Sequence, residues 1–499
     1  MKHVALLVLV LTLCCRFAVA QDEPIRLSNA QLETEAYALA MQGDFAGALP
    51  LFQEMARRQP DSFVPQYNIA SARARLGQAD AALDALDRAL ELGFDDLAHL
   101  RHDPDLEPIR NTERFAHIID TWPQRMEGLA NARFQTLLER FGGRYHTQED
   151  EFLRLRFAIG LPKESFDLAR AELDATSRWA VAELFDNLVE ADATMVPWVS
   201  VVIPTDRDFA RWLGARHGEA ARSAMRQIAG TYDHDRKQLV CKDLGATLRH
   251  EVFHALHYRS QSLEGQRHAA WILEGLASLV EDVDIDDDGT PSFAPSWRTN
   301  IVKKANRGGA LKSLSLLAET PDHIFVGSTQ LLHYGHARAV MLYLVAADKL
   351  DDFYAHYVDT WDRDRTGVQA LERTFDATID QVDTSFRRWV ERLPVAPEQH
   401  HPPMTTLGID VDGERGEGLA VLRTVRGSPG QRAGVRPRDV LVAINGQGTR
   451  DLNELYRVIG RYVPGDMVVL TVRRGRQMLE LPARLGSRRD FDTIRIPGG

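Results

Sequence analysis

Two histidines four residues apart, with a glutamate directly after the first, are the residues of this sequence best placed to do chemistry. The segment reads His250-Glu251-Val252-Phe253-His254. On an α-helix, residues four apart differ by about 40° in direction and about 6 Å along the axis, so both imidazoles reach one metal ion from the same face. Glu251 projects beside them and can contact a water molecule on that ion. A helix that carries two hydrogen-bonded histidines and no metal is the alternative.

A third ligand is predicted 20 residues after His254, at Glu274 in the apolar segment 269–283. Because this segment is apolar nearly all round, its carboxylate needs a partner or a metal ion. Two histidines and one glutamate leave the fourth position of a zinc ion open to water, as a catalytic site requires. We therefore predict one Zn²⁺ bound by His250, His254 and Glu274, with Glu251 as the general base. A Glu274 paired with an arginine is the alternative.

The elements that must position these residues are two strongly apolar helices, predicted at 244–258 and 269–283. The short connection between them permits an antiparallel pair in which the carboxylate faces the imidazoles. Asp243 is a candidate cap for the first helix. The other strands and helices of the region are predicted at 196–203, 237–241, 330–350 and onward to 389. The sequence thus predicts an α+β domain over residues 126–393.

The His-Glu-x-x-His motif and the Glu-Gly-x-Ala segment that begins at Glu274 together resemble the gluzincin branch of zinc metallopeptidases, the thermolysin-like architecture. The resemblance covers roughly residues 196–393. It implies an endopeptidase, because the Gly-x-Met-Glu-Asn signature of gluzincin aminopeptidases is absent. It also implies an edge strand that pairs with extended substrate, by analogy the stretch 235–241. The glycine and third histidine of the metzincin branch are missing.

Such a site usually adds a hydrogen-bond donor for the oxyanion. His333, Tyr334 and His336 are the candidates, and the family resemblance implies Tyr334. The alternative for each is packing or solvent exposure. His257, one turn beyond His254, is expected to be a packed or hydrogen-bonded histidine, since its axial offset makes it a poor ligand.

An acidic segment after the second helix matches the opening of a calcium-binding loop. Asp284, Asp286, Asp288 and Gly289 have the required spacing, but Pro295 stands where a bidentate glutamate is needed. We expect an acidic turn here, and calcium binding stays open as the alternative.

The N-terminus has the features of a cleavable signal peptide at residues 1–20, with an apolar run at 4–13 and a small-x-small site that ends at Ala20. The run is too short to span a bilayer, and no later run is long enough. We therefore expect an exported bacterial protein, periplasmic or secreted, without a transmembrane segment in the mature chain. Lipid attachment at Cys14 is an alternative.

Cys241 is expected to be buried, and a catalytic thiol there is the remote alternative.

A repeat of 34 residues follows the predicted signal peptide. Gly43 and Ala48 recur as Gly77 and Ala82. This period and these small residues resemble tetratricopeptide repeats, which implies paired helices over residues 29–122. The repeats either bind a partner or support the next domain.

After a proline-rich linker at 394–405, the segment 406–486 alternates like a small β domain. It resembles a PDZ domain of the type associated with bacterial proteases. The resemblance implies that the amides of Leu407, Gly408 and Ile409 hold the terminal carboxylate of a peptide, which adds a strand to the neighbouring edge. A PDZ domain retained only for packing or regulation is the alternative.

Length and charge set the remaining limits. A chain of 499 residues is too long for one core, and a formal net charge of −11 does not favour binding to nucleic acid or anionic membranes. We predict a multidomain, mainly α protein with a helical repeat array, a zincin-like α+β domain and a small β-rich PDZ domain. The predicted function is an exported zinc endopeptidase that hydrolyses peptide bonds through a metal-activated water, while its repeats and PDZ domain bind protein or peptide partners. A non-catalytic periplasmic scaffold with a peptidase fold is the competing hypothesis.

Overall fold

The structure is a computed structural model, and it describes residues 27–142, 144–190, 196–218, 229–234, 236–286, 288–327, 329–398, 402–412 and 416–491. The predicted signal peptide lies outside these ranges. Within them, no helix combines the length and hydrophobicity needed to cross a membrane. The chain forms two compact units. One holds the residues up to 94 together with 100–119, and the other holds 95–99 and everything from 120 onward.

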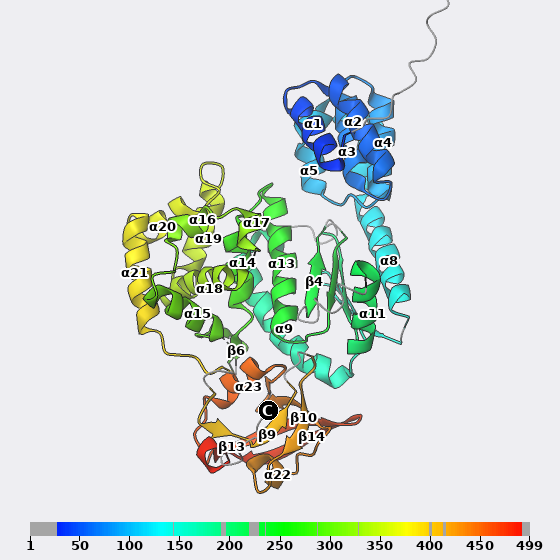
Figure 1. Ribbon diagram of the computed structural model, residues 1–499. Helices are drawn as coiled ribbons and strands as arrows, with labels where there is room; N and C mark the ends of the chain where they lie inside the picture. Colours follow the sequence, from blue (N-terminus) through cyan, green and yellow to red (C-terminus); the bar gives the residue numbers. More distant parts are fainter. Residues whose placement is uncertain are drawn as a thin grey trace, which may run out of the picture. The chain divides into compact units, whose positions relative to one another are not determined.

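The first unit consists of antiparallel helices joined by short turns (Figure 1). Its principal helices are α1 (Asn29–Met41), α2 (Phe45–Arg58), α3 (Phe63–Arg75) and α4 (Ala79–Glu91). The shorter α6 (Glu107–Arg110) and α7 (Glu113–Asp120) follow, and α5 (Leu97–His102) is divided between the two units. Gly43 and Gly77 turn the chain between the members of each pair with φ of +80° and +72°, which favours glycine. Ala48 and Ala82 are fully buried and let the paired helices approach closely.

A five-stranded sheet in the order β1-β2-β3-β5-β4 forms the first half of the central region. The strands are β1 (His146–Asp150), β2 (Leu155–Ile159), β3 (Val199–Ile203), β4 (Gly230–Asp233) and β5 (Gln238–Cys241). The three inner strands are parallel and buried throughout, as is typical of a sheet covered on both faces. The outer strands β1 and β4 pair antiparallel to their neighbours.

Helices cover both faces of this sheet because successive strand residues point to opposite sides. Val201 packs in one core with α9 (Lys163–Glu183) and α13 (Ala246–Leu263), and Val202 packs in another with α8 (Trp122–Phe141) and α11 (Asp206–His217).

The expected position of the edge strand was wrong. The stretch 235–241 was predicted to be the edge, but β5 lies inside the sheet, between β3 and β4. Because β5 pairs in parallel with β3 while β4 folds back on its other side, β4 becomes the outermost strand. The sequence periodicity of a short buried strand does not reveal whether that strand lies inside the sheet or at its edge.

The second half of the central region is helical. Its elements are α14 (Ala270–Leu279), a small hairpin of β6 (Val283–Ile285) and β7 (Pro291–Phe293), α15 (Trp297–Arg307), α16 (Leu314–Ala318), α17 (Asp322–Phe325), α18 (Gln330–Ala346), α19 (Leu350–Thr360), α20 (Val368–Phe375) and α21 (Ile379–Arg392). At Gly275 in α14, a Cβ atom would lie 3.1 Å from the backbone of Ala337 in α18. Glycine therefore lets these two helices pack closely, which fixes the neighbouring Glu274.

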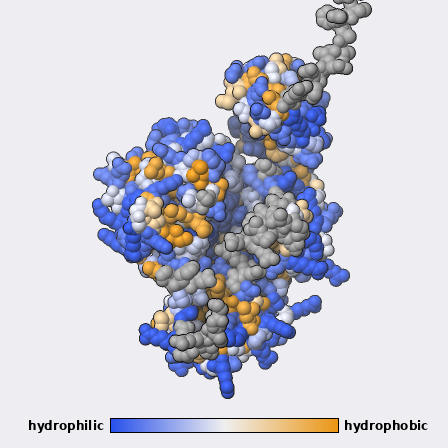
Figure 2. Space-filling model, viewed as in Figure 1, coloured by the Kyte–Doolittle hydropathy of each residue, from blue (hydrophilic) through white to orange (hydrophobic). Residues whose placement is uncertain are grey.

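The last part of the chain has a core of its own and a sheet in the order β14-β13-β11-β10-β9. The elements are β9 (Ile409–Val411), β10 (Leu419–Thr424), α22 (Pro429–Ala433), β11 (Val440–Ile444), β12 (Gln447–Gly448), α23 (Leu452–Ile459), β13 (Met467–Arg474) and β14 (Gln477–Arg484). On the face shown in Figure 2, hydrophilic residues predominate and hydrophobic residues gather in separate patches. The predicted fold class, a multidomain and mainly α protein with a β-rich C-terminal module, is confirmed.

Candidate metal centre

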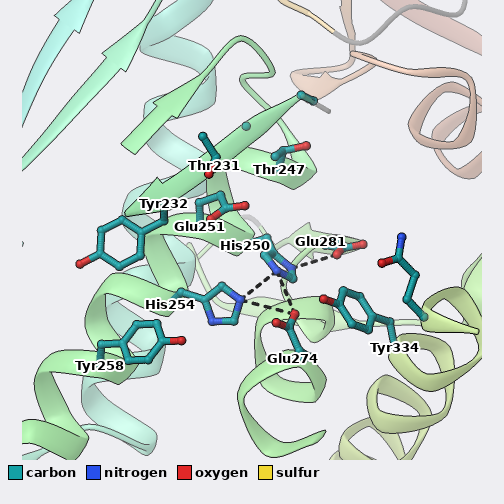
Figure 3. A pocket seen from close by; sticks show the side chains of 13 residues that line it. Thr231, Tyr232, Thr247, His250, Glu251, His254, Tyr258, Glu274, Glu281 and Tyr334 are labelled. Atoms are coloured by element: carbon teal, nitrogen blue, oxygen red, sulfur yellow. Dashed lines mark hydrogen bonds and ion pairs between the residues drawn. The ribbon is translucent and has the colours of Figure 1, made fainter. Parts of the chain in front are cut away.

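Three side chains from two helices meet at one point of the central region (Figure 3). His250 and His254 lie one turn apart on α13, and Glu274 comes from α14. The Nε2 atoms of the two imidazoles are 3.0 Å apart. Oε2 of Glu274 lies 3.3 Å from Nε2 of His250 and 3.5 Å from Nε2 of His254. The structure thus brings together the three residues predicted as ligands.

Asp243, predicted as a cap, lies two residues before Gly245, which is the N-cap residue of α13. Its carboxylate accepts hydrogen bonds from the backbone amides of Gly245 and Thr247, each 2.9 Å long. The apolar residues Val252 and Leu256 of α13 are buried in the core. The hydrogen bonds of Asp243 and the core contacts together fix the rotation of the helix, so that its histidines face α14.

The three side chains fit a zinc ion. Their ligand atoms all lie within 4.8 Å of one another. In a tetrahedral site with bonds of about 2.0–2.1 Å, ligand atoms are about 3.3 Å apart. Oε2 of Glu274 is buried without a hydrogen-bond donor, which a cation would compensate. Two imidazoles and a carboxylate are also a donor set that suits zinc.

Burial and mutual contacts set the charges of the metal-free site. Burial would raise the pKa of Glu274, but His254 and His250 hold it well below its ordinary value, so the carboxylate is ionised. Burial would lower the pKa of His250, but Glu274 and Glu281 raise it to about 10. A metal ion must displace this proton, so binding releases a proton and tightens as pH rises. Burial raises the pKa of Glu251, which suits a general base.

Glu281 is a residue of the site that the sequence did not indicate. Its Oε1 lies 2.9 Å from Nδ1 of His250, on the side of the ring away from Glu274. Arg298 holds the same carboxylate through two hydrogen bonds of 2.8 Å. Such a carboxylate fixes the orientation of a metal-binding imidazole and raises its basicity. No motif marks Glu281, because its contact with His250 arises from the packing of α13 against the end of α14.

Replacing Glu281 by glutamine is expected to weaken zinc binding by about 10- to 100-fold, the usual effect of losing an outer partner of a ligand. The matched control is Glu264→Gln at the exposed end of α13. Competition with a chromophoric chelator measures both dissociation constants. Equal zinc affinity in the two variants would show that Glu281 does not orient His250.

Tyr334 alone of the three predicted oxyanion donors lines the same cavity. Its pKa is raised by burial and by the nearby Glu274 carboxylate, so its hydroxyl keeps its proton. His333 is buried and contacts the carbonyl oxygen of Phe325 at 3.0 Å. His336 is buried and stacks on Phe386. The two histidines therefore point away from the site.

The cavity has a volume of about 480 Å³, and the edge strand β4 forms one of its walls. Glu251 lies at the cavity between the two histidines and β4 (Figure 3). Tyr232 of β4 and Tyr258 of α13 also line it, and neither was predicted from the sequence.

His257, expected to be packed or hydrogen-bonded, is completely buried, and its Nε2 lies 2.8 Å from Nδ1 of His268. Burial lowers the pKa of His268 to about 4 and that of His257 well below its ordinary value. Both rings are therefore neutral at pH 7 and serve the core.

The buried histidine pair predicts a loss of stability in acid. The unfolded chain protonates His268 near pH 6.5 and the folded chain does so only near pH 4, so the stability that depends on His268 is complete above pH 6.5 and falls as pH decreases towards 4. Complete protonation of His268 lowers the free energy of unfolding by about 3 kcal/mol. His268→Gln should flatten the dependence of the unfolding free energy on pH between 6.5 and 4.5, as measured by urea denaturation. Identical slopes in variant and parent would contradict this assignment.

The acidic segment forms the β6–β7 hairpin, and its first aspartate already has partners. The carboxylate of Asp284 forms ion pairs with Arg457 and Arg461 of the α23 region. Asp288 accepts a hydrogen bond of 3.0 Å from the amide of Thr290. These contacts support the acidic turn over a calcium loop.

Cys241 is buried at the end of β5, where its thiol donates to the carbonyl oxygen of Asp243 at 2.9 Å. It is thus a residue of the core and not of the cavity, as expected from the sequence.

Leu407, Gly408 and Ile409 line a second cavity of about 340 Å³, whose other wall includes Leu455 and Tyr456 of α23. The amide of Gly408 already donates to Oγ1 of Thr406 at 3.1 Å. A bound carboxylate must therefore displace this hydroxyl in order to use all three amides.

Two family models match the chain, a tetratricopeptide repeat over residues 39–102 and a PDZ domain over residues 421–474. Both are protein-interaction modules, and the two predicted resemblances are confirmed. The chain therefore joins these two modules to a further domain of helices and a five-stranded sheet, in which the side chains of His250, His254 and Glu274 converge.

Among curated proteins, the chain is 33% identical over 84 residues to a chloroplastic protein of Arabidopsis thaliana, a match that covers 16% of this chain and 25% of that protein. It is 39% identical over 69 residues to a probable periplasmic serine endoprotease DegP-like of Chlamydia muridarum, which covers 14% of each. The chain thus spans a quarter or less of these relatives.

Among solved structures, the HtrA-type protease AlgW with a decapeptide is 28% identical over 17% of this chain and 30% of that chain, with a TM-score of 0.16. An aminopeptidase N family protein from Idiomarina loihiensis covers 67% of this chain and 65% of its own at 13% identity, with a TM-score of 0.24.

Proposed function

We propose that this protein is an exported bacterial zinc endopeptidase whose repeat and PDZ modules bind protein substrates or partners. The observation that carries the proposal is the convergence of His250, His254 and Glu274 beside Glu251 in one cavity. A buried structural zinc site would have four protein ligands, whereas this group has three and opens into a cavity. The edge strand β4 beside it gives an extended peptide a backbone to pair with.

Each residue of the cavity has a role in this reaction. A bound zinc ion supplies a Lewis acid and lowers the pKa of water. The carboxylate of Glu251 accepts a proton from the attacking water and delivers it to the leaving amine nitrogen. The hydroxyl of Tyr334 donates a hydrogen bond to the carbonyl oxygen of the scissile bond as that oxygen gains negative charge. Glu281 holds the ring of His250 in the orientation that presents Nε2 to the ion.

A non-catalytic scaffold is the second candidate, favoured by the two interaction modules. It predicts partner binding without hydrolysis. The four side chains at the cavity favour the peptidase, because a scaffold has no need of them together.

Removal of the metal separates the two candidates. The mature chain is expected to degrade unfolded casein, to lose this activity after dialysis against a strong zinc chelator and to regain it when one equivalent of Zn²⁺ is added. A serine protease inhibitor is the control and should have no effect. Hydrolysis that persists in the chelated protein, or its absence from the zinc-loaded protein, would refute the proposal.

A further inference from the structure

Four ionisable side chains, three of them almost completely buried, meet between the PDZ domain and the helix that carries the histidines. Arg249 of α13 donates to Oε2 of Glu172 at 2.7 Å and to Oε1 of Glu454 at 3.3 Å. Arg450 donates to the same Oε2 of Glu172 at 2.6 Å. Arg249, Arg450 and Glu454 are each only 2% exposed. We call these four residues the interdomain cluster. Two of them, Arg450 and Glu454, belong to the PDZ domain.

The backbone before α13 is in direct contact with the same PDZ residues. A Cβ atom at Gly245 would lie 2.6 Å from Oε1 of Glu454 and 2.7 Å from Cδ of Arg450. The amide of Leu244 also donates to the carbonyl oxygen of Gly416 in the PDZ domain, at 3.4 Å. The absence of a side chain at Gly245 therefore lets the PDZ domain pack against the start of the histidine-bearing helix.

Arg249 connects this cluster to the metal centre in two ways. It directly precedes His250 in the chain, and it donates to the carbonyl oxygens of Val280 at 2.9 Å and Glu281 at 2.6 Å. The side chain of Glu281 is in turn the partner of Nδ1 of His250. A change in the position of Arg249 would therefore move both the helix and the carboxylate that orients its first histidine.

We propose that Glu454 of the PDZ domain is a positioning residue of the metal centre, which acts through Arg249. The inference rests on the zinc site of the proposed function. Glu454 accepts hydrogen bonds from the side chain of Arg249 and from the amide of Arg450, and removing an acceptor from such a buried cluster lets its donors move. Loss of the Glu454 carboxylate thus loosens Arg249, and with it the placement of Glu281 against His250.

The test compares two carboxylate-to-amide changes in the PDZ domain of the full chain. Glu454→Gln alters the interdomain cluster, whereas Asp439→Asn alters a carboxylate that is also buried but bonds Arg474 within the PDZ domain. Zinc dissociation constants come from chelator competition, and kcat and KM from a fluorogenic peptide. Glu454→Gln should weaken zinc binding about tenfold, which is the smallest effect usual for losing an outer partner of a metal ligand. It should also change kcat by a larger factor than KM. Asp439→Asn should bind zinc within about twofold of the parent.

A double-mutant cycle measures whether Arg249 and Glu454 affect zinc affinity through each other, which separate structural effects of the two residues would not show. Because Arg249 and Glu454 act in one chain of contacts, Arg249→Lys combined with Glu454→Gln should weaken zinc binding by less than the product of the single effects. If Glu454→Gln shows no cooperative unfolding transition, Arg450→Lys replaces it in the same comparison.

Equal zinc affinity in Glu454→Gln and Asp439→Asn would overturn the inference while leaving the zinc peptidase in place. A parent chain that binds no zinc would overturn the proposed function and the inference together.

Discussion

Glu251→Gln should bind one zinc ion per chain with the affinity of the parent and hydrolyse unfolded protein about 10²- to 10⁴-fold more slowly. The amide keeps the size of the side chain but cannot accept the proton of the attacking water. Glu251 also lines the cavity without being among the three converging ligand atoms, so its replacement leaves the metal ligands intact. The measurements are kcat/KM with a fluorogenic peptide and zinc content by mass spectrometry.

Glu251→Gln should change hydrolysis without changing zinc content. Asp243, whose carboxylate accepts from the amides of Gly245 and Thr247 at the start of α13, serves as the comparison. Asp243→Asn should lower thermal stability with little change in kcat of the folded protein. Full hydrolytic activity in Glu251→Gln would exclude Glu251 as the general base, and loss of zinc would make it a residue of the metal site instead.

Glu274→Gln should lose zinc binding by a larger factor than the 10- to 100-fold expected for Glu281→Gln, because it removes a ligand and not the partner of a ligand. In the parent, Oε2 of Glu274 lies 3.3 Å from Nε2 of His250 and 3.5 Å from Nε2 of His254. In the variant, a neutral amide faces two imidazole nitrogens that are 3.0 Å apart.

The control for this variant is Glu319→Gln, an exposed carboxylate at the end of α16. Isothermal titration with Zn²⁺ measures both variants at one pH, because the proton on His250 makes the affinity depend on pH. Zinc binding by Glu274→Gln as tight as that of the control would mean that the ion has another acidic ligand.

The residues of the metal centre that local periodicity governs were predictable from the sequence. His250 and His254 share a helix face because they are four residues apart, and Glu274 was identified because a carboxylate stood in an apolar segment. The choice among the three oxyanion candidates depended on rotation about α18. Residues one apart differ by about 100°, so Tyr334 faces the cavity while its neighbour His333 points to Phe325.

Contacts between elements far apart in the sequence could not be predicted in the same way. Glu281 meets His250 only because the end of α14 packs beside α13, and Tyr232 reaches the cavity only because β4 is the edge strand. The interdomain contact of Arg249 with Glu454 joins residues 205 positions apart. No spacing rule relates such pairs, since the packing of the whole unit determines them.

The most direct test is a crystal structure of the zinc-loaded mature chain with anomalous diffraction data collected on both sides of the zinc absorption edge. One anomalous peak is expected within about 2.0–2.2 Å of Nε2 of His250, Nε2 of His254 and Oε2 of Glu274, with a solvent molecule as the remaining ligand. A loaded protein whose zinc lies elsewhere, or one with no zinc between α13 and α14, would contradict the metallopeptidase.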